Sequence, residues 1–156
     1  MTLEELARRI QTLEDLEAIK KLKARYCLYC DNDYDADGIA SLFTEDGVWD
    51  GGNFGKYDGR EAIRTFFRGA PKIFPFAIHQ VMNPIIDVQG DKATGSWYLF
   101  QPATRAEGNQ TQAVWLAARY QEEYVRVGSE WKFKHLKVFA SFLTPFDQGW
   151  VKKQFV

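Results

Sequence analysis

The sequence is poor in the residues that form metal centres and disulfide frameworks. Its 156 residues include only two cysteines and two histidines. Cys27 and Cys30 form one C-x-x-C pair, but no second pair is present to complete a tetrahedral zinc site. The pair also lies inside a helical pattern and not at a turn between a strand and a helix. We therefore interpret both as buried or half-buried thiols of a reducing compartment, and we expect no metal.

Charge of one sign and long apolar runs are also scarce. Lys and Arg number 20 against 21 Asp and Glu, a formal net charge of −1, so there is no basic surface for nucleic acid or an anionic membrane. No apolar run approaches the roughly 20 residues that span a bilayer, and the polar start from Glu4 onward is unlike a signal peptide. We expect a cytoplasmic protein that binds neither nucleic acid nor membrane.

Motifs for nucleotides, phosphates and serine nucleophiles are missing as well. There is no G-x-G-x-x-G after a strand, no P-loop and no G-x-S-x-G. The run from Asp33 to Gly38 matches the first half of a calcium-binding loop, but Thr44 stands where that loop requires glutamate. We interpret Asp33 or Asp35 as a helix N-cap instead. Any chemistry is therefore predicted to use acid–base groups without a cofactor.

Aromatic residues are what the sequence has in excess. Twelve Phe, seven Tyr and five Trp make up 15% of the chain, and such side chains fill a core or line a cavity for a flat, apolar ligand. A chain of this length can bury roughly 68–70% of its unfolded surface in one domain. We expect a single domain over residues 1–156, with an N-terminal arm at 1–12 and a C-terminal tail at 144–156.

Hydrophobic periodicity predicts that helices come first. Residues 2–30 are predicted to be helical, with a break between the arm and the main helix near Gln11, because apolar residues recur at three- and four-residue intervals. A short helix is expected around Ile39 and another over Arg60 to Arg68. The apolar stripe of the main helix is Leu13, Leu16, Ile19, Leu22, Tyr26, Tyr29 and Cys30.

The second half of the chain is predicted to be strands, since the period changes to two from Phe76. Gly90–Asp91 and Gly128–Ser129 supply tight turns, and Arg105 to Gln110 a wider one. Helices followed by a meander of long strands indicate the α+β class, with one curved antiparallel sheet and helices on a single face. The predicted strands cover residues 76–89, 92–103, 111–127 and 130–143.

The strongest candidate for chemistry is a histidine paired with a carboxylate. His79 lies in the first long strand, where a histidine is ordinarily a hydrogen-bonded core or surface residue. Asp31 follows the long helix, whose exit should pack against the concave face of the sheet. A carboxylate would fix the tautomer of the imidazole and stabilise the imidazolium form, which makes a general base. Tyr26, about one turn before Asp31, could donate a proton to a carbonyl or a leaving hydroxyl.

Other candidates have simpler structural interpretations. His135 shares strand parity with Trp131, and the lysines on both sides of it suggest an exposed or rim position. Tyr98 and Tyr120 lie in strands, where a tyrosine ordinarily packs with its phenol at an edge. Trp49 is typical of either a core or a ligand wall.

The order of the motifs resembles the SnoaL-like branch of the nuclear-transport-factor-like superfamily. The resemblance runs from about Leu13 to Val138, and within the superfamily the chain is most similar to the bile-acid dehydratase and scytalone dehydratase groups. The matching motifs are Tyr26-x-x-x-x-Asp31, Leu42 to Trp49, Gly59 to Ile63, His79 with Asn83–Pro84, Gly90 to Tyr98, and Gly128 to Phe133.

The resemblance implies a cone-shaped α+β barrel. In such a barrel, three or four N-terminal helices pack on the concave face of a curved sheet around a deep apolar pocket, where water is eliminated without a cofactor. Tyr26, Asp31 and His79 fall where the bile-acid group carries its tyrosine, aspartate and histidine, and Tyr120 falls on a matching tyrosine. Gln101 replaces a pocket aspartate of that group, and its arginine falls near Ala140.

The departures continue in the second group. The second histidine of the scytalone group falls near Ala103, and its Ser/Asn pair falls near Ala118 and Tyr120. The groups that would orient a substrate therefore differ from both relatives, so the resemblance does not identify the substrate.

The leading hypothesis is a cofactor-independent lyase of the dehydratase type, acting on a hydrophobic cyclic hydroxy-carbonyl compound. His79 would abstract a proton, Asp31 would orient His79, and Tyr26 would hydrogen-bond the carbonyl or the leaving hydroxyl. The residues predicted to contact the substrate are Tyr120, Tyr98, Trp49, Gln101 and Leu116.

The same residues leave other functions open. They could serve an isomerase or a polyketide-cyclase-type enzyme, a non-enzymatic binding module for a small molecule or a partner protein, or a non-catalytic subunit of an oxygenase. We expect a homodimer or homotrimer, because helices on one face of a sheet leave the other face to be covered. The tail after Thr144 is predicted to be either a lid over the pocket or an oligomer contact.

Overall fold

A single long helix begins the fold. The computed structural model describes residues 1–156, and in it α1 runs unbroken from Leu3 to Asp31. Thr2 and Glu5 form the capping box at its start: the Thr2 hydroxyl accepts from the Glu5 N–H at 3.1 Å, and the Glu5 carboxylate accepts from the Thr2 N–H at 2.7 Å. The break expected near Gln11 is absent, because both segments are helical in the same register and nothing disrupts the turn between them.

Two short helices and a tight loop follow α1. Asp35 is the N-cap of α2 (Ala36–Ser41), and its carboxylate accepts from the Gly38 N–H at 2.9 Å, as one of the two predicted caps requires. Asp33 and Tyr34 in the loop have positive φ angles of 52° and 51°. Helix α3 spans Arg60–Gly69, flanked by the short 3-10 turns η1 (Gly52–Phe54) and η2 (Ala70–Lys72).

The strands form one curved sheet that stays open. Its order is β2-β1-β7-β6-β5-β3, with β4 also paired to β5. The α+β class is confirmed, but the sheet is mixed, since β1 runs parallel to β7; side-chain periodicity carries no information about strand direction. The strands are β1 (Phe43–Asp50), β2 (Lys56–Asp58), β3 (Phe76–Ala77), β4 (Gln80–Gln89), β5 (Lys92–Glu107), β6 (Gln110–Val127) and β7 (Glu130–Pro145).

Two strand boundaries differ from the prediction. Strands β5 and β6 extend to Glu107 and Gln110, so a tight turn with Gly108 at φ 60° replaces the wider one. The predicted strand 76–89 is divided into β3 and β4 around His79. The division has a physical cause: the His79 N–H donates to the Asp31 carboxylate and so takes no part in the β5 ladder.

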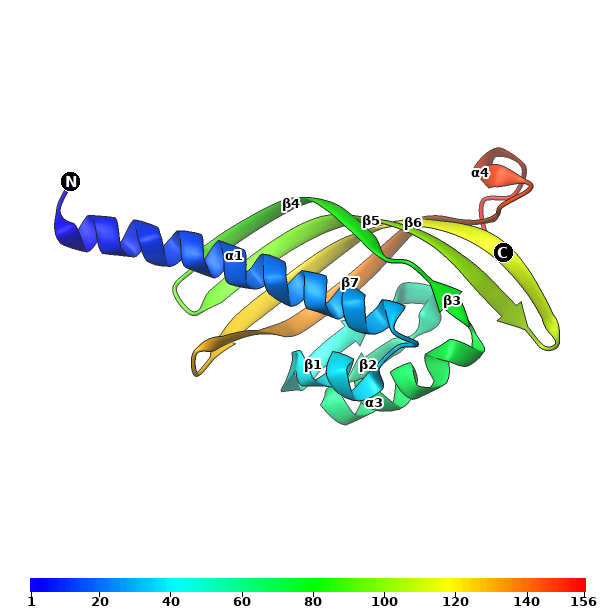
Figure 1. The fold of residues 1–156 in the computed structure, drawn as a ribbon, viewed down its shortest axis with the longest axis horizontal. Coiled ribbons are helices and arrows are strands. Elements are labelled where there is room, and N and C mark those ends of the chain that lie inside the picture. The colour runs from blue at the N-terminus through cyan, green and yellow to red at the C-terminus, as the bar shows by residue number, and fades with distance from the viewer.

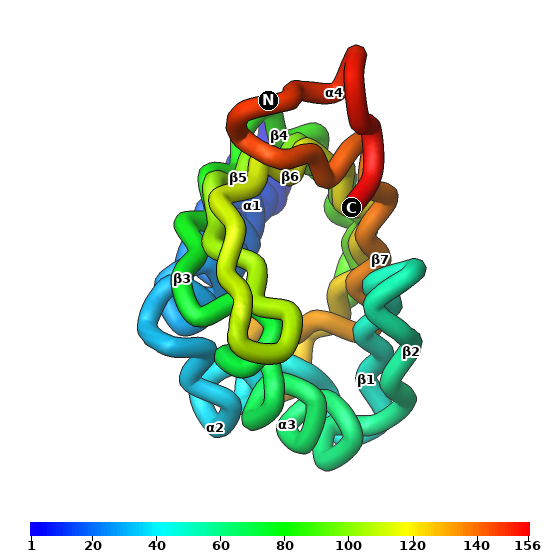
Figure 2. Tube along the Cα trace, turned by 90° about the vertical axis from the view of Figure 1, so that its right-hand side faces the viewer, coloured from blue at the N-terminus to red at the C-terminus, as the bar shows by residue number.

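The helices lie inside the curve of the sheet. Helix α1 crosses the concave side and contacts β4 and β7, while α2 packs on α3. Seen along the long axis, β3 lies on one side and β1 and β2 on the other, with α2 and α3 across the space between these edges (Figure 2). None of the helices combines the length with the apolar character that crossing a lipid bilayer requires.

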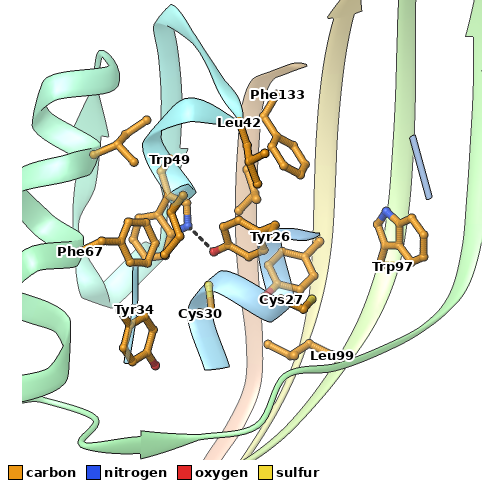
Figure 3. Packing of buried hydrophobic residues seen from close by; sticks show 14 of the residues in the cluster. Tyr26, Cys27, Cys30, Tyr34, Leu42, Trp49, Phe67, Trp97, Leu99 and Phe133 are labelled. Atoms are coloured by element: carbon orange, nitrogen blue, oxygen red, sulfur yellow. Dashed lines mark hydrogen bonds between the residues drawn. The ribbon is translucent and has the colours of Figure 1, made fainter. Parts of the chain in front are cut away.

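The core lies between the second half of α1 and the sheet. Tyr26 and Cys30 of α1 are buried in one cluster with Phe133 of β7 and Leu99 of β5 (Figure 3), and Ile19 belongs to the same cluster. Cys27 and Cys30 are free and buried, in agreement with the thiol interpretation. Burial raises the pKa of the Cys27 thiol to about 11, which keeps it protonated and poorly nucleophilic.

Candidate functional site

His79 and Asp31 meet where the end of α1 lies beside the junction between β3 and β4. The Asp31 Oδ1 lies 2.7 Å from His79 Nδ1 and also accepts the His79 backbone N–H at 2.9 Å. The imidazole is 6% exposed and the carboxylate 29%. An ionised carboxylate on Nδ1 holds the proton there, which leaves the lone pair of Nε2 as the acceptor of a proton from another molecule.

The imidazole borders a small, almost entirely apolar cavity. Its volume is about 60 Å³, below the roughly 300–1,000 Å³ of typical small-molecule sites. A ligand the size of a six-membered ring therefore requires the surrounding aromatic side chains to shift. The lining residues are Tyr26, Tyr34, Trp49, Phe54, Phe66, Phe67, Ala70, Ile73, Phe74, His79, Leu99, Gln101, Leu116, Tyr120 and Val138.

Tyr26 contributes a phenol to the cavity wall and is held in place by Trp49. The Trp49 Nε1–H donates to the Tyr26 hydroxyl at 3.0 Å (Figure 3). Burial raises the pKa of Tyr26 well above its ordinary value, and the nearby Cys30 acts in the same direction. The phenol is consequently neutral and can act as a proton or hydrogen-bond donor.

Of the five predicted contact residues, the structure brings four to this cavity. Trp49, Gln101, Leu116 and Tyr120 all line it. Tyr98 does not: it is 53% exposed, because its neighbours in β5 point inward and strand alternation turns Tyr98 to the outer face.

Gln101 is the one carboxamide in the lining. Its side chain stands on β5, and the residue is 3% exposed. A carboxamide both donates and accepts hydrogen bonds and carries no charge. Gln101 therefore supplies an uncharged donor and acceptor to the cavity.

Sequence reasoning missed the wall contributed by Tyr34 and α3. Tyr34 stacks on Phe67 with ring centroids 6.0 Å apart and meets His79 edge-on at 6.0 Å. Burial raises the pKa of Tyr34, so this phenol is neutral too. The apolar stripe of α3 was visible in the sequence, but only the fold shows that Phe66 and Phe67 line the same cavity as His79.

A buried ion pair beside the cavity was also missed. Lys23 of α1 bonds Glu122 of β6, and both side chains are 0% exposed. The Tyr124 hydroxyl donates to the other oxygen of Glu122, and the Trp97 Nε1–H donates to Tyr124 at 3.0 Å. The Lys23 ammonium also lies 3.2 Å from the centroid of the Tyr120 ring, a cation–π contact.

His135 lies away from the cavity, on the outer face of the sheet. A register shift in the β6–β7 ladder lies between Phe133 and His135, so His135 does not share the inward parity of Trp131 that the alternation predicted. It pairs across the ladder with Glu123, and its Nε2 has no hydrogen-bond partner. The described residues contain no group of three or more metal-ligating side chains.

The C-terminal tail takes no part in this site. It forms the short helix α4 (Gly149–Lys152) and then turns back along β7. There Leu143 exchanges hydrogen bonds of 3.0 Å with Gln154 and Val156. Trp150 stacks on Phe142 with centroids 5.0 Å apart. No residue beyond Val138 lines the cavity.

Comparison with known proteins places this architecture in a family. The SnoaL-like domain matches residues 11–137, which is most of the chain. The chain belongs to the SnoaL-like family. The dyad and every lining residue of the cavity except Val138 lie within the matched residues, whereas the first ten residues and the C-terminal tail lie outside them.

Relatives of this SnoaL-like chain include characterised enzymes and solved structures. Gamma-hexachlorocyclohexane dehydrochlorinase of Sphingobium indicum is 27% identical over 140 residues, covering 85% of this chain and 88% of the relative. The crystal structure of a type 2 hexachlorocyclohexane dehydrochlorinase superposes with a TM-score of 0.81 at 26% identity, covering 88% and 93%.

A third structural neighbour describes the fold. It is an NTF2-like protein with a cystatin-like fold from Novosphingobium aromaticivorans, with a TM-score of 0.67 at 24% identity, covering 97% of this chain and 95% of the neighbour. At that identity the likeness concerns the fold alone.

Proposed function

We propose that this SnoaL-like protein is a cofactor-independent lyase that eliminates water from a hydrophobic, cyclic hydroxy-carbonyl compound. The observation that carries the proposal is the His79–Asp31 pair at 2.7 Å, with its imidazole on the wall of an apolar cavity. A histidine oriented by a carboxylate is a general base, and exclusion of water strengthens its interactions with a bound substrate.

The reaction needs one base and one acid. His79 Nε2 takes a proton from the carbon next to the carbonyl, and the electron pair of that C–H bond forms the new double bond as the C–O bond breaks. The departing hydroxide takes the phenolic proton of Tyr26 and leaves as water, and the proton on His79 then returns to Tyr26. Gln101 donates to the carbonyl oxygen, where negative charge develops during proton removal.

The lining also restricts the substrate. It contains no Lys or Arg, so an anionic carboxylate or phosphate inside the cavity would have no cationic partner. A neutral, planar or ring-shaped compound fits the stacked aromatic walls. The relative in Sphingobium indicum is named as a dehydrochlorinase, which supports elimination as the reaction type while leaving water or another group as the leaving group.

The first prediction concerns the base. His79→Asn should lower kcat/KM by about 10²–10⁴, the usual contribution of a positioned proton-transfer group, with the melting temperature nearly unchanged because the backbone N–H bond to Asp31 remains. The assay is turnover of a panel of neutral cyclic hydroxy-ketones, followed by absorbance of the new conjugated double bond.

His135→Asn is the matched control, since it removes the other imidazole from the outer face and should leave the rate unchanged. Equal turnover by His79→Asn and the parent would contradict the assignment. If the panel gives isomerised or cyclised products that depend on His79, the dyad is the base of an isomerase or cyclase. Tight binding without turnover, unaffected by His79→Asn, would indicate a binding module.

A further inference from the structure

The first turns of α1 project from the body of the protein. Residues 3–14 continue the helix beyond the edge of the sheet (Figure 1), and every one of them is exposed. The first buried residue is Asp15, whose carboxylate accepts from Trp131 Nε1–H at 3.1 Å and from Arg126 at 2.8 Å. In the structure the arm therefore comprises residues 3–14, instead of the 1–12 expected from the sequence. A helix of this length has little intrinsic stability in water when nothing packs against it.

The arm carries one apolar stripe that lies outside the buried core of the chain. Leu3, Leu6, Ile10 and Leu13 are 85%, 40%, 48% and 65% exposed. Their spacing of three, four and three residues is that of the a and d positions of two heptads, with Leu3 and Ile10 at a and Leu6 and Leu13 at d. A β-branched residue at a together with leucine at d favours two-stranded coiled coils.

The charges beside the stripe specify whether two such arms would pair in parallel or antiparallel orientation. In this heptad frame Arg9 is at g and Glu14 at e, and neither has an ion-pair partner within the chain. In a parallel pair, a g residue faces the e residue five positions later on the other helix, so Arg9 meets Glu14 twice. In an antiparallel pair g faces g, and Arg9 would meet Arg9.

We propose that the arms of two copies of this chain pair as a short, parallel, two-stranded coiled coil. The opposite face of the arm argues against a membrane as the partner. Glu4, Glu5 and Arg8 leave it without the excess of basic residues that anionic lipid attracts. Pairing would bury the stripe and join two cavity-bearing domains side by side, with both arms pointing the same way.

The first experiment changes the stripe in the full-length chain. Ile10→Glu places like charges opposite each other at a paired a position, and sedimentation equilibrium should show the dissociation constant of the assembly rising at least tenfold. Arg8→Glu at the outer f position is the control and should leave it unchanged. Because Ile10 is 48% exposed and lies outside the buried core, thermal unfolding of the dissociated protein should stay close to that of the parent.

A charge exchange tests the predicted ion pairs. Arg9→Glu or Glu14→Arg alone brings like charges together and should weaken association, and the double variant Arg9→Glu/Glu14→Arg should restore it. Both positions are exposed in the single chain, so two independent substitutions there would not compensate each other. Restoration by the double variant therefore requires a contact between the two positions. A parent chain that is monomeric, or an assembly insensitive to Ile10→Glu, would overturn the proposal.

Cross-linking tests the orientation. Leu3→Cys places two thiols opposite each other only in a parallel pair, so mild oxidation should give a covalent dimer, while Arg8→Cys should give little. Failure of Leu3→Cys to exceed Arg8→Cys would overturn the parallel arrangement. Binding of the monomeric parent to phosphatidylserine vesicles, lost in Ile10→Glu, would overturn the proposal in favour of a lipid surface.

Discussion

At the scale of the residue, the pair of Lys23 and Glu122 is the least expected feature. Two fully buried charges cost several kcal/mol each to desolvate, and only close pairing with further hydrogen bonds offsets that cost. Tyr124 provides such a bond to Glu122, and burial together with the Glu122 charge raises the pKa of Tyr124, so its phenol stays a donor. The pair lies directly behind the ring of Tyr120, which lines the cavity.

This arrangement predicts an asymmetric response to substitution. Lys23→Met should lower the free energy of unfolding by about 3–5 kcal/mol, because Glu122 is left as an uncompensated buried charge. Lys23→Met/Glu122→Gln should recover a large part of that loss, since Gln can still accept from Tyr124. Urea denaturation followed by tryptophan fluorescence measures both. A double variant no more stable than Lys23→Met would contradict this account.

The same scale shows what the sequence could and could not predict about the site. The pairing of Asp31 with His79 was predictable, because one follows a core-facing helix and the other lies in an apolar strand. The sequence contains a signal for the Lys23–Glu122 pair. Lys23 lies one turn after Ile19 on the apolar stripe, and Glu122 shares inward parity with Tyr120, so each is a charge at a core position. That they meet depends on tertiary packing.

At the scale of the element, α1 is fixed to the sheet by Asp15. Burial acts to raise the pKa of Asp15. The hydrogen bonds from Arg126, Trp131 and Gln11 outweigh this effect and hold the pKa below its ordinary value. A depressed carboxyl pKa contributes stability that is present above the pKa of the unfolded chain and is lost as the pH falls through the pKa of the folded state.

Asp15→Asn should therefore destabilise the protein in a pH-dependent way. Near neutral pH the loss should be about 1.5–3 kcal/mol, the range for hydrogen bonds to a charged group. The difference between parent and variant should hold down to about pH 4 and shrink below it, because protonated Asp15 resembles the amide. Chemical denaturation at a series of pH values measures this. A difference that is constant from pH 7 to pH 2 would exclude the ionised carboxylate as its source.

Gly95 of β5 lies against the Tyr124 network. A Cβ at this position would lie 2.8 Å from the Tyr124 hydroxyl, which is bonded to both Glu122 and Trp97. Gly95→Ala should cost about 1–3 kcal/mol, the usual effect of overpacking. Gly69→Ala in α3 is the control, since nothing lies within 4 Å of its added methyl. Equal stability of the two variants in thermal unfolding would contradict the steric argument.

Element boundaries illustrate the limits of periodicity. Alternation located the long strands to within a few residues. It misplaced His135 because the register shift next to this residue reverses the parity, and no residue type marks that irregularity. It also could not foresee that the His79 N–H would leave the ladder for Asp31, since that depends on a contact between positions 48 residues apart.

At the scale of the whole molecule, the cavity and the core occupy the same space. Residues such as Tyr26, Phe67 and Leu116 belong to the buried cluster and also line the cavity. The small void leaves their packing incomplete, so filling it should strengthen the fold and weaken the site.

Ala70 offers a test of this conflict, because it lies on the cavity wall and is 3% exposed. Ala70→Val should raise the free energy of unfolding by about 0.5–2 kcal/mol, as cavity-filling substitutions commonly do, and should lower turnover of ring-shaped substrates. Thermal unfolding and kinetic assays on the same preparation measure both quantities. A variant that is less stable and equally active would show that the void is neither fillable nor used.

The contacts of α1 also have a consequence for biosynthesis. This helix is synthesised before the sheet, and Lys23 contacts a partner 99 residues later in the chain, while Asp15 contacts Trp131, 116 residues later. Long loops must close before those contacts form, which slows folding. The core-facing side of the nascent helix therefore stays exposed, and accessible to chaperones, until β6 and β7 have been synthesised. Nonsense truncations before β7 should accordingly yield chains that are cleared by proteases.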